Sequence, residues 1–256
     1  QAAASLKPRH RAATWQAVAE ALLAAGQKQD ADRMFRRAIE DWGRDPNSLG
    51  CANDATETGR RLIKLGEREL AALCLRAAVE MVSRSPNAEQ RMIRLMFLVT
   101  DLDAAGARED AARVVEQCRV ILARQASTRP AAEAEAYVHE NRSYLLAFQA
   151  VVDPQIALKE MQTLPPRNRP LAYQLIVRHL SWSGQTDAAK AVAEQHRTSE
   201  IPHVALAMAK KGELQELQQW LADLERRGVE FDRVRAYIGA ANGLYQRSGR
   251  TPPVFP

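Results

Sequence analysis

Apolar side chains recur along the chain at the three- and four-residue spacing of an amphipathic helix. Between residues 15 and 46 this spacing occurs twice, once on each side of Gly26. The apolar positions are Trp15, Val18, Ala19 and Leu22 in the first half and Ala31, Phe35, Ala38 and Ile39 in the second. Glycine ends helices because it adopts the left-handed conformation at little cost, and Pro46 disfavours helix at the residue before it. The stretch therefore predicts an antiparallel pair of helices.

This pattern repeats with a period of 40 residues. Gly26, Gly66 and Gly106 mark the same point in three successive units. Three further columns follow these glycines in register: Ala31, Ala71 and Ala111; Phe35, Leu75 and Val115; Ala38, Ala78 and Cys118. A lone helical hairpin cannot bury all its apolar surface, so such repeats stack on one another.

The second half of the chain keeps the helical spacing but loses the fixed period. The segment 126–130 interrupts the register, and the proline-rich segment 164–170 predicts a turn. We therefore expect an all-α solenoid of about six helical hairpins plus a C-terminal capping helix. The predicted parts are a flexible lead-in at 1–9, three regular repeats of about 40 residues at 10–126, irregular repeats with the capping helix at 127–249, and a tail at 250–256.

The composition agrees with helices and leaves the surface charge open to two interpretations. Apolar residues make up 46% of the chain and aromatic residues only 5%, which favours helices over sheet. The formal net charge is +5 and the pI is about 9.3, with acidic and basic residues interleaved throughout. The charges form either ordinary solvated helix faces or a basic strip that attracts an acidic partner.

The cysteines and the longest apolar run constrain the cellular setting. Three widely spaced cysteines without a CxxC motif argue against a disulfide framework. Cys118 falls in the same repeat column as Ala38 and Ala78, so we expect its thiol in the core. No apolar run approaches the about 20 residues that span a bilayer. The beginning, QAAAS, carries no signal peptide, which leaves the cytoplasm and, after removal of a signal, the periplasm. The wealth of alanine and arginine gives the impression of a bacterial protein.

These columns resemble the tetratricopeptide repeat. The family's large and small positions fall here on Trp15, Val18, Ala19, Leu22, Ala31, Phe35, Ala38 and Pro46, and its second-helix positions recur at Ala71, Leu75, Ala78 and Pro86. The first helix of the second repeat is more polar than the family pattern, and the period is 40 residues instead of 34. Paired helices of the HEAT type, which have a similar period, are the alternative. The resemblance covers about residues 10–125 best.

The resemblance implies a right-handed α–α superhelix whose first helices line a concave groove for a segment of another protein. The positions that correspond to this groove are Gln16, Glu20, Asn53, Arg60, Lys64, Met96, Asp103, Arg142, Gln174, Arg178 and Lys210. Five of these are basic, so an acidic segment is one candidate guest. The clamp of Lys and Asn pairs that grips a C-terminal carboxylate in some family members is not reproduced.

Motifs of catalysis and of cofactor binding are absent from the sequence. It contains no GxxxxGK[ST], GxGxxG, GxSxG, HExxH or CxxC, so we expect no catalytic residues, no cofactor and no metal. The group His139-Glu140-Asn141-Arg142 points in different directions on a helix and is a solvated face. Trp220 is expected in the core. Trp182 is expected at an exposed helix end, where it has two interpretations: a surface residue, or an anchor for a partner.

Three classes of function remain. The favoured one is a non-catalytic scaffold for protein–protein interaction, because a stack of helical repeats offers a long surface. The alternatives are a helical-repeat protein that binds RNA or other nucleic acid, and the non-catalytic repeat region of a larger enzyme or secretion assembly. The interleaved acidic residues and the few aromatic residues argue against nucleic acid. The sequence leaves the partner and the oligomeric state open.

Overall fold

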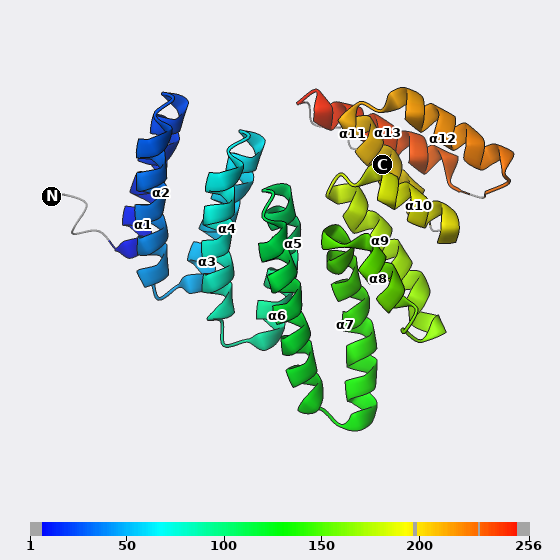
Figure 1. Ribbon diagram of the computed structural model, residues 1–256, viewed down its shortest axis with the longest axis horizontal. Coiled ribbons are helices and arrows are strands. Elements are labelled where there is room, and N and C mark those ends of the chain that lie inside the picture. The colour runs from blue at the N-terminus through cyan, green and yellow to red at the C-terminus, as the bar shows by residue number, and fades with distance from the viewer. Residues whose placement is uncertain (1–6, 197–198, 230, 250–256) are drawn as a thin grey trace. The chain divides into compact units, whose positions relative to one another are not determined.

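A computed structural model describes residues 7–196, 199–229 and 231–249 (Figure 1). Over these residues the chain forms thirteen α-helices and no strand, so the predicted all-α fold of helical hairpins is confirmed. The helices are α1 (Pro8–Ala24), α2 (Lys28–Arg44), α3 (Ser48–Lys64), α4 (Arg68–Ser83), α5 (Ala88–Ala104), α6 (Arg108–Ser127), α7 (Ala131–Val152), α8 (Pro154–Met161), α9 (Arg169–Trp182), α10 (Thr186–His196), α11 (Ile201–Lys211), α12 (Leu214–Arg226) and α13 (Arg233–Arg247). A short 3-10 helix, η2, spans Pro166–Asn168.

The chain divides into two compact units, Gln1–Gln125 and Ala126–Pro256, called unit 1 and unit 2. Residues 1–6 of the predicted lead-in and the predicted tail 250–256 lie outside the described residues. The last residues of the predicted lead-in, Pro8 and Arg9, already belong to α1.

Glycines end the first helix of each hairpin in unit 1. Gly26, Gly66 and Gly106 have φ angles of 77°, 80° and 79°, in the left-handed region where a side chain would be strained. The apolar faces of the two helices then meet, and Phe35 and Leu75 of the second helices are fully buried. The helix ends and the buried core positions of unit 1 thus recur with the 40-residue period predicted from the sequence.

Several contacts between successive hairpins of unit 1 share one separation. Arg60 pairs with Asp101, Arg94 Nη1 donates to Asn53 Oδ1 at 2.6 Å, and Arg84 Nη1 donates to the Gly43 carbonyl at 3.0 Å. Each pair is 41 residues apart, one more than the period. In these contacts, a residue at position i therefore touches position i+41, one residue beyond its equivalent at i+40 in the next repeat.

The first helix departs from the prediction at Val18, which was expected on the buried face but is exposed. Its equivalents in the next two repeats, Thr58 and Leu98, are both buried. In the described part of the chain no helix precedes α1, so the side of α1 on which the previous hairpin would pack meets solvent. The α1–α2 contact is instead reinforced by Asp41, which accepts from Trp15 Nε1 at 3.1 Å and pairs with Arg11 at 2.7 Å. The hydrogen bond from Arg11 holds the pKa of Asp41 below its usual value.

The three cysteines are buried and free, in agreement with the expectation of no disulfide framework. Burial raises the pKa of Cys51 to about 11, and that of Cys74 and Cys118 to about 12. These thiols are therefore protonated core residues at neutral pH.

Unit 2 is held by a core that runs through α7, α9 and α11. Helix α9 packs against α7, α10 and α11, and Ile176 and Leu180 on its inner face are fully buried. Helix α11 packs most extensively against α13 and much less against α12, its neighbour in sequence. Glycines explain the close approach: a Cβ atom at Gly239 or Gly243 would lie 2.3 Å from the carbonyl oxygen of Pro202 or Leu206, respectively.

Candidate partner-binding surface

The predicted groove residues of unit 1 lie on the first helices α1, α3 and α5. They are Gln16 and Glu20 on α1, Asn53, Arg60 and Lys64 on α3, and Met96 and Asp103 on α5. Met96 is a wrong prediction, because its side chain is buried in the core and cannot line a groove. The other six are exposed or half-buried.

The 40-residue period places two exposed columns across these first helices. One column contains Ala13, Asn53 and Ile93, and the other contains Ala17, Glu57 and Phe97. All six residues are exposed. Positions that carry small or polar residues in the first two repeats therefore carry large apolar residues in the third. Ile93 is 48% exposed and Phe97 is 54% exposed.

A surface hollow of about 540 Å³ lies between α3 and α5, called the α3/α5 hollow. Most of its polar residues come from α3, with Arg94 and Asp101 from α5, and its apolar side is formed by Ile93 and Phe97. The remaining lining residues are Ala52, Asn53, Asp54, Thr56, Glu57, Arg60, Val82, Arg94, Leu98 and Asp101. Two of the predicted groove residues, Asn53 and Arg60, are thus brought together here.

Several polar residues of the α3/α5 hollow already make contacts within the chain. Arg60 Nε lies 3.0 and 3.1 Å from the two carboxylate oxygens of Asp101, and Arg60 Nη2 lies 3.0 Å from Oδ2. Burial nevertheless raises the pKa of Asp101, because the desolvation of its carboxylate outweighs the hydrogen bond from Arg60. Asp54 is likewise paired, with Arg9 at 2.7 Å. A bound partner would therefore gain most by covering the exposed apolar side chains of Ile93 and Phe97.

The positive charge expected in the groove is partly cancelled by carboxylates of the chain. Besides Arg60, the predicted groove residue Arg178 forms an ion pair, with Glu200 at 3.0 Å. Glu200 is buried, and its pKa is lowered because the hydrogen bonds from His203 and Arg178 together outweigh its desolvation. Lys64 and Lys210 are exposed. The sequence missed both ion pairs because each joins residues far apart in sequence: Arg60 and Asp101 lie on different helices, and Glu200 precedes α11.

The predicted residues of unit 2 lie on α7, α9 and α11. Arg142 donates to Thr163 Oγ1 at 2.7 Å, and Gln174 donates to Ser199 Oγ at 3.3 Å. Trp182 is exposed, as expected, at the end of α9, whereas Trp220 is buried in the core. The Trp182 ring lies edge-on to His179, with ring centroids 5.0 Å apart.

His179 is a buried packing residue beneath this tryptophan. Its ring centroid lies 4.2 Å from that of Phe148. Burial, with a smaller contribution from Arg178, lowers the pKa of His179 to about 4. The imidazole is therefore neutral at physiological pH. Over the described residues no group of three or more His, Cys, Asp or Glu side chains is arranged to hold a metal ion.

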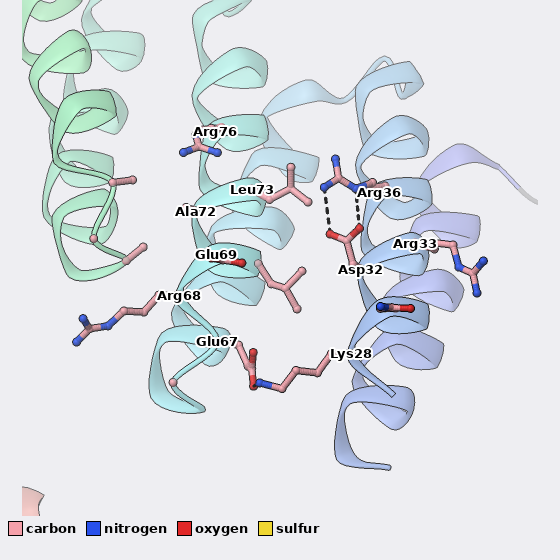
Figure 2. A pocket seen from close by; sticks show the side chains of 16 residues that line it. Lys28, Asp32, Arg33, Arg36, Glu67, Arg68, Glu69, Ala72, Leu73 and Arg76 are labelled. Carbon is pink, nitrogen blue, oxygen red and sulfur yellow. Dashed lines mark hydrogen bonds and ion pairs between the residues drawn. The ribbon is translucent and has the colours of Figure 1, made fainter. Parts of the chain in front are cut away.

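A second hollow of unit 1 lies on the second helices α2 and α4, beside the turn 105–107 (Figure 2), and is called the α2/α4 hollow. Its volume is about 1060 Å³. Figure 2 shows two ion pairs among its charged side chains: Lys28 Nζ lies 2.7 Å from Glu67 Oε1, and Arg36 Nε donates to Asp32 Oδ2 at 2.8 Å. The lining carries five basic and three acidic side chains, and two of the basic ones, Arg33 and Arg76, pair with Asp30 and Asp110 beside the hollow. This hollow is therefore highly charged, unlike the apolar side of the α3/α5 hollow.

Comparison with known proteins does not place the chain in a family: no family model matches the sequence, and no curated protein matches it. The structure also shows no described helix with the length and apolar character needed to cross a membrane. The assignment of a function therefore depends on the surfaces described above.

Proposed function

We propose that unit 1 is a non-catalytic protein-interaction module that binds a segment of another protein in the α3/α5 hollow. The observation that carries this proposal is the exposure of Ile93 and Phe97 side by side at positions that repeat across the first helices. The likeness of the repeat columns to tetratricopeptide repeats supports it, since that family binds peptides on its first helices.

The physical gain comes from removing these two side chains from water. Burial of an apolar side chain of this size contributes about 1.5–3 kcal/mol. Aromatic residues in such positions commonly dominate the binding energy, while the polar surroundings exclude water. Asn53 and Glu57 on the opposite side of the hollow provide groups that can hydrogen-bond the backbone of the bound segment.

The lining favours an apolar anchor over a purely acidic guest. The charged lining residues are Arg60 and Arg94 against Asp54, Glu57 and Asp101, so the hollow has no excess of positive charge. An acidic segment would compete with Asp101 for Arg60, and the phosphates of a nucleic acid would meet the same carboxylates. A segment that inserts apolar side chains between Ile93 and Phe97 avoids this cost.

A comparative pull-down tests the proposal. The wild type, an Ile93→Ser/Phe97→Ser variant and a Leu73→Ser control are used as baits in an extract of the source organism, and bound proteins are quantified by mass spectrometry. Leu73 lines the α2/α4 hollow, so its variant controls for the loss of surface apolar area. We expect one or more proteins to be recovered by the wild type and the control but not by the double variant. Equal recovery with all three baits, or recovery of RNA alone, would refute the proposal.

A further inference from the structure

The outward face of α13 is a continuous apolar stripe. Its members recur at helical spacing and include no charged residue: Val234, Tyr237, Ile238, Ala241, Leu244 and Tyr245. Val234 is 69% exposed and Tyr237 is 59% exposed, and Leu244 and Tyr245 are exposed as well. This set is called the α13 stripe. Large apolar residues gathered on one exposed helix face mark an interaction site more often than scattered ones do.

The opposite face of α13 is already occupied. Ala236, Gly239 and Gly243 are buried, and the two glycines bring α13 against the backbone of α11. In the other hairpins a first helix also packs on a second helix, as α1 does on α2 and α3 does on α4. Over the described residues no helix fills the corresponding place on the α13 stripe. The stripe is therefore an apolar helix face that no described helix covers.

The charges beside the stripe indicate which kind of helix fits. The charged residues of α13 beside the stripe are all arginines: Arg233 and, with its guanidinium against Gly212, Arg247 along one edge, and Arg235 along the other. Arg233 pairs with Glu225 at 3.1 Å and Arg235 with Asp232 at 3.2 Å; Glu225 is half-buried, and the other three side chains are exposed. Such pairs are weak and readily exchange partners.

A second copy of the chain is a poor occupant. An antiparallel pair of α13 helices would bring Arg233 of one copy opposite Arg247 of the other, and a parallel pair would bring Arg235 beside an arginine of the facing edge. Like charges along the edges of a helix pair disfavour that pairing, whereas opposite charges select a partner.

We propose that the α13 stripe binds an amphipathic helix of another protein, whose apolar face is bordered on both edges by carboxylates. The apolar faces would pack ridge into groove, and the carboxylates would pair with Arg233, Arg235 and Arg247. This interaction surface is separate from the α3/α5 hollow, and either can be refuted without the other.

Two synthetic helical peptides test the proposal on the 256-residue chain. Both carry leucine at the i, i+3, i+4 and i+7 spacing, and they differ only in having glutamate or lysine at the positions beside the leucines. Affinities are measured by fluorescence anisotropy with the wild type, a Tyr237→Ser/Leu244→Ser variant and an Arg233→Glu/Arg247→Glu variant. Ile156→Ser is the control, because Ile156 is an exposed apolar residue on another helix of unit 2. Circular dichroism establishes that each variant is folded.

The expected pattern has three parts. The wild type and the control bind the glutamate peptide at least about tenfold more tightly than the lysine peptide. The serine variant loses this binding, and the glutamate variant reverses the preference. Equal or absent binding of both peptides by the folded wild type would overturn the proposal. A wild-type dimer in light scattering that dissociates in the serine variant would overturn it in favour of a second copy.

Discussion

Arg60 and Asp101 join the first helices of two successive repeats through three contacts of 3.0 to 3.1 Å. The two residues are 41 positions apart, the same separation as Asn53 and Arg94. The ion pair thus fixes the register between α3 and α5 at the place where the α3/α5 hollow forms. It also compensates a carboxylate whose pKa is raised by burial.

Replacement of Arg60 by alanine should destabilise unit 1. The substitution leaves the largely buried carboxylate of Asp101 without its partner, at an expected cost of about 1–2 kcal/mol. The Arg60→Ala/Asp101→Asn variant should be less affected, because a neutral amide is buried at lower cost. Urea denaturation at pH 7 measures both. Equal destabilisation of the single and double variants would contradict the compensating role of Arg60.

Protonation gives an independent check of the same pair. Burial raises the pKa of Asp101 in the folded state, so the folded chain holds this proton more tightly than the unfolded chain does. Lowering the pH therefore favours folding through this group, and more so when Arg60 is absent. The difference in stability between Arg60→Ala and the wild type should shrink as the pH is lowered from 7 towards the pKa of Asp101. A difference that is constant with pH would contradict this account.

Arginine at position 71 should disrupt the α3–α4 contact. Ala71 is fully buried, and its carbonyl oxygen would lie 3.4 Å from a Cβ atom at Gly59. An unpaired charge in this contact should cost about 4 kcal/mol or more. Ala112→Arg is the matched control, because Ala112 is exposed on α6 and should change stability by at most about 0.5 kcal/mol. Thermal unfolding followed by circular dichroism compares them, and similar melting temperatures would show that the repeat register is wrong.

Glycine-to-alanine substitutions at two helical positions should have opposite signs. A Cβ atom at Gly239 would lie 2.3 Å from the Pro202 carbonyl oxygen, so Gly239→Ala must push α13 away from α11, at a cost of about 1–3 kcal/mol. A Cβ atom at Gly43, in α2, has no such neighbour within 4 Å. Gly43→Ala should therefore stabilise the chain by about 0.5–1 kcal/mol through helix propensity. Denaturant unfolding measures both, and stabilisation by Gly239→Ala would contradict the close approach of α11 and α13.

Replacement of His179 by phenylalanine should reduce the pH dependence of stability. The pKa of His179 is about 4 in the folded chain, below the ordinary value of about 6.5 for histidine, so the unfolded chain takes up this proton first. Stability present above pH 6.5 is therefore lost as the pH falls towards 4, by about 2 kcal/mol between pH 7 and pH 5. Glu200, whose pKa is lowered, titrates below this window. His179→Phe should lack this part of the loss.

The measurement for His179 is the free energy of unfolding in urea at pH 7 and pH 5. His10→Gln serves as the control, because it removes an exposed histidine instead of the buried one. A His179→Phe variant that loses as much stability as the wild type over this range would show that the imidazole is not held neutral by the fold.

Much of the fold was predictable because local rules and tertiary packing agree. Gly26, Gly66 and Gly106 were expected to end helices and do so with positive φ angles. Val18 was placed in the core because helical spacing does not show whether another hairpin covers a face. Helix α13 was expected from its pattern, but its contact with α11 was not. The four-residue spacing of Gly239 and Gly243 was the available signal.

The candidate site was only partly predictable from the sequence. Of the predicted groove residues, Asn53 and Arg60 line the α3/α5 hollow, whereas Met96 is buried. Ile93 and Phe97 were missed because apolar residues on a helix are usually core residues. Comparison of each repeat column would have shown them, since Asn53 and Glu57 hold the same positions one repeat earlier. The pairing of Arg60 depends on the offset between repeats, which the period alone does not give.

The most direct test of the central claim is site-specific photo-cross-linking of a partner recovered by the pull-down. Benzoylphenylalanine is placed at position 97 in one sample and at position 73 in another, and the cross-linked adducts are quantified after illumination. Binding in the α3/α5 hollow predicts adducts from position 97 and none above background from position 73. Adducts from position 73 alone would contradict the account and place the partner at the α2/α4 hollow.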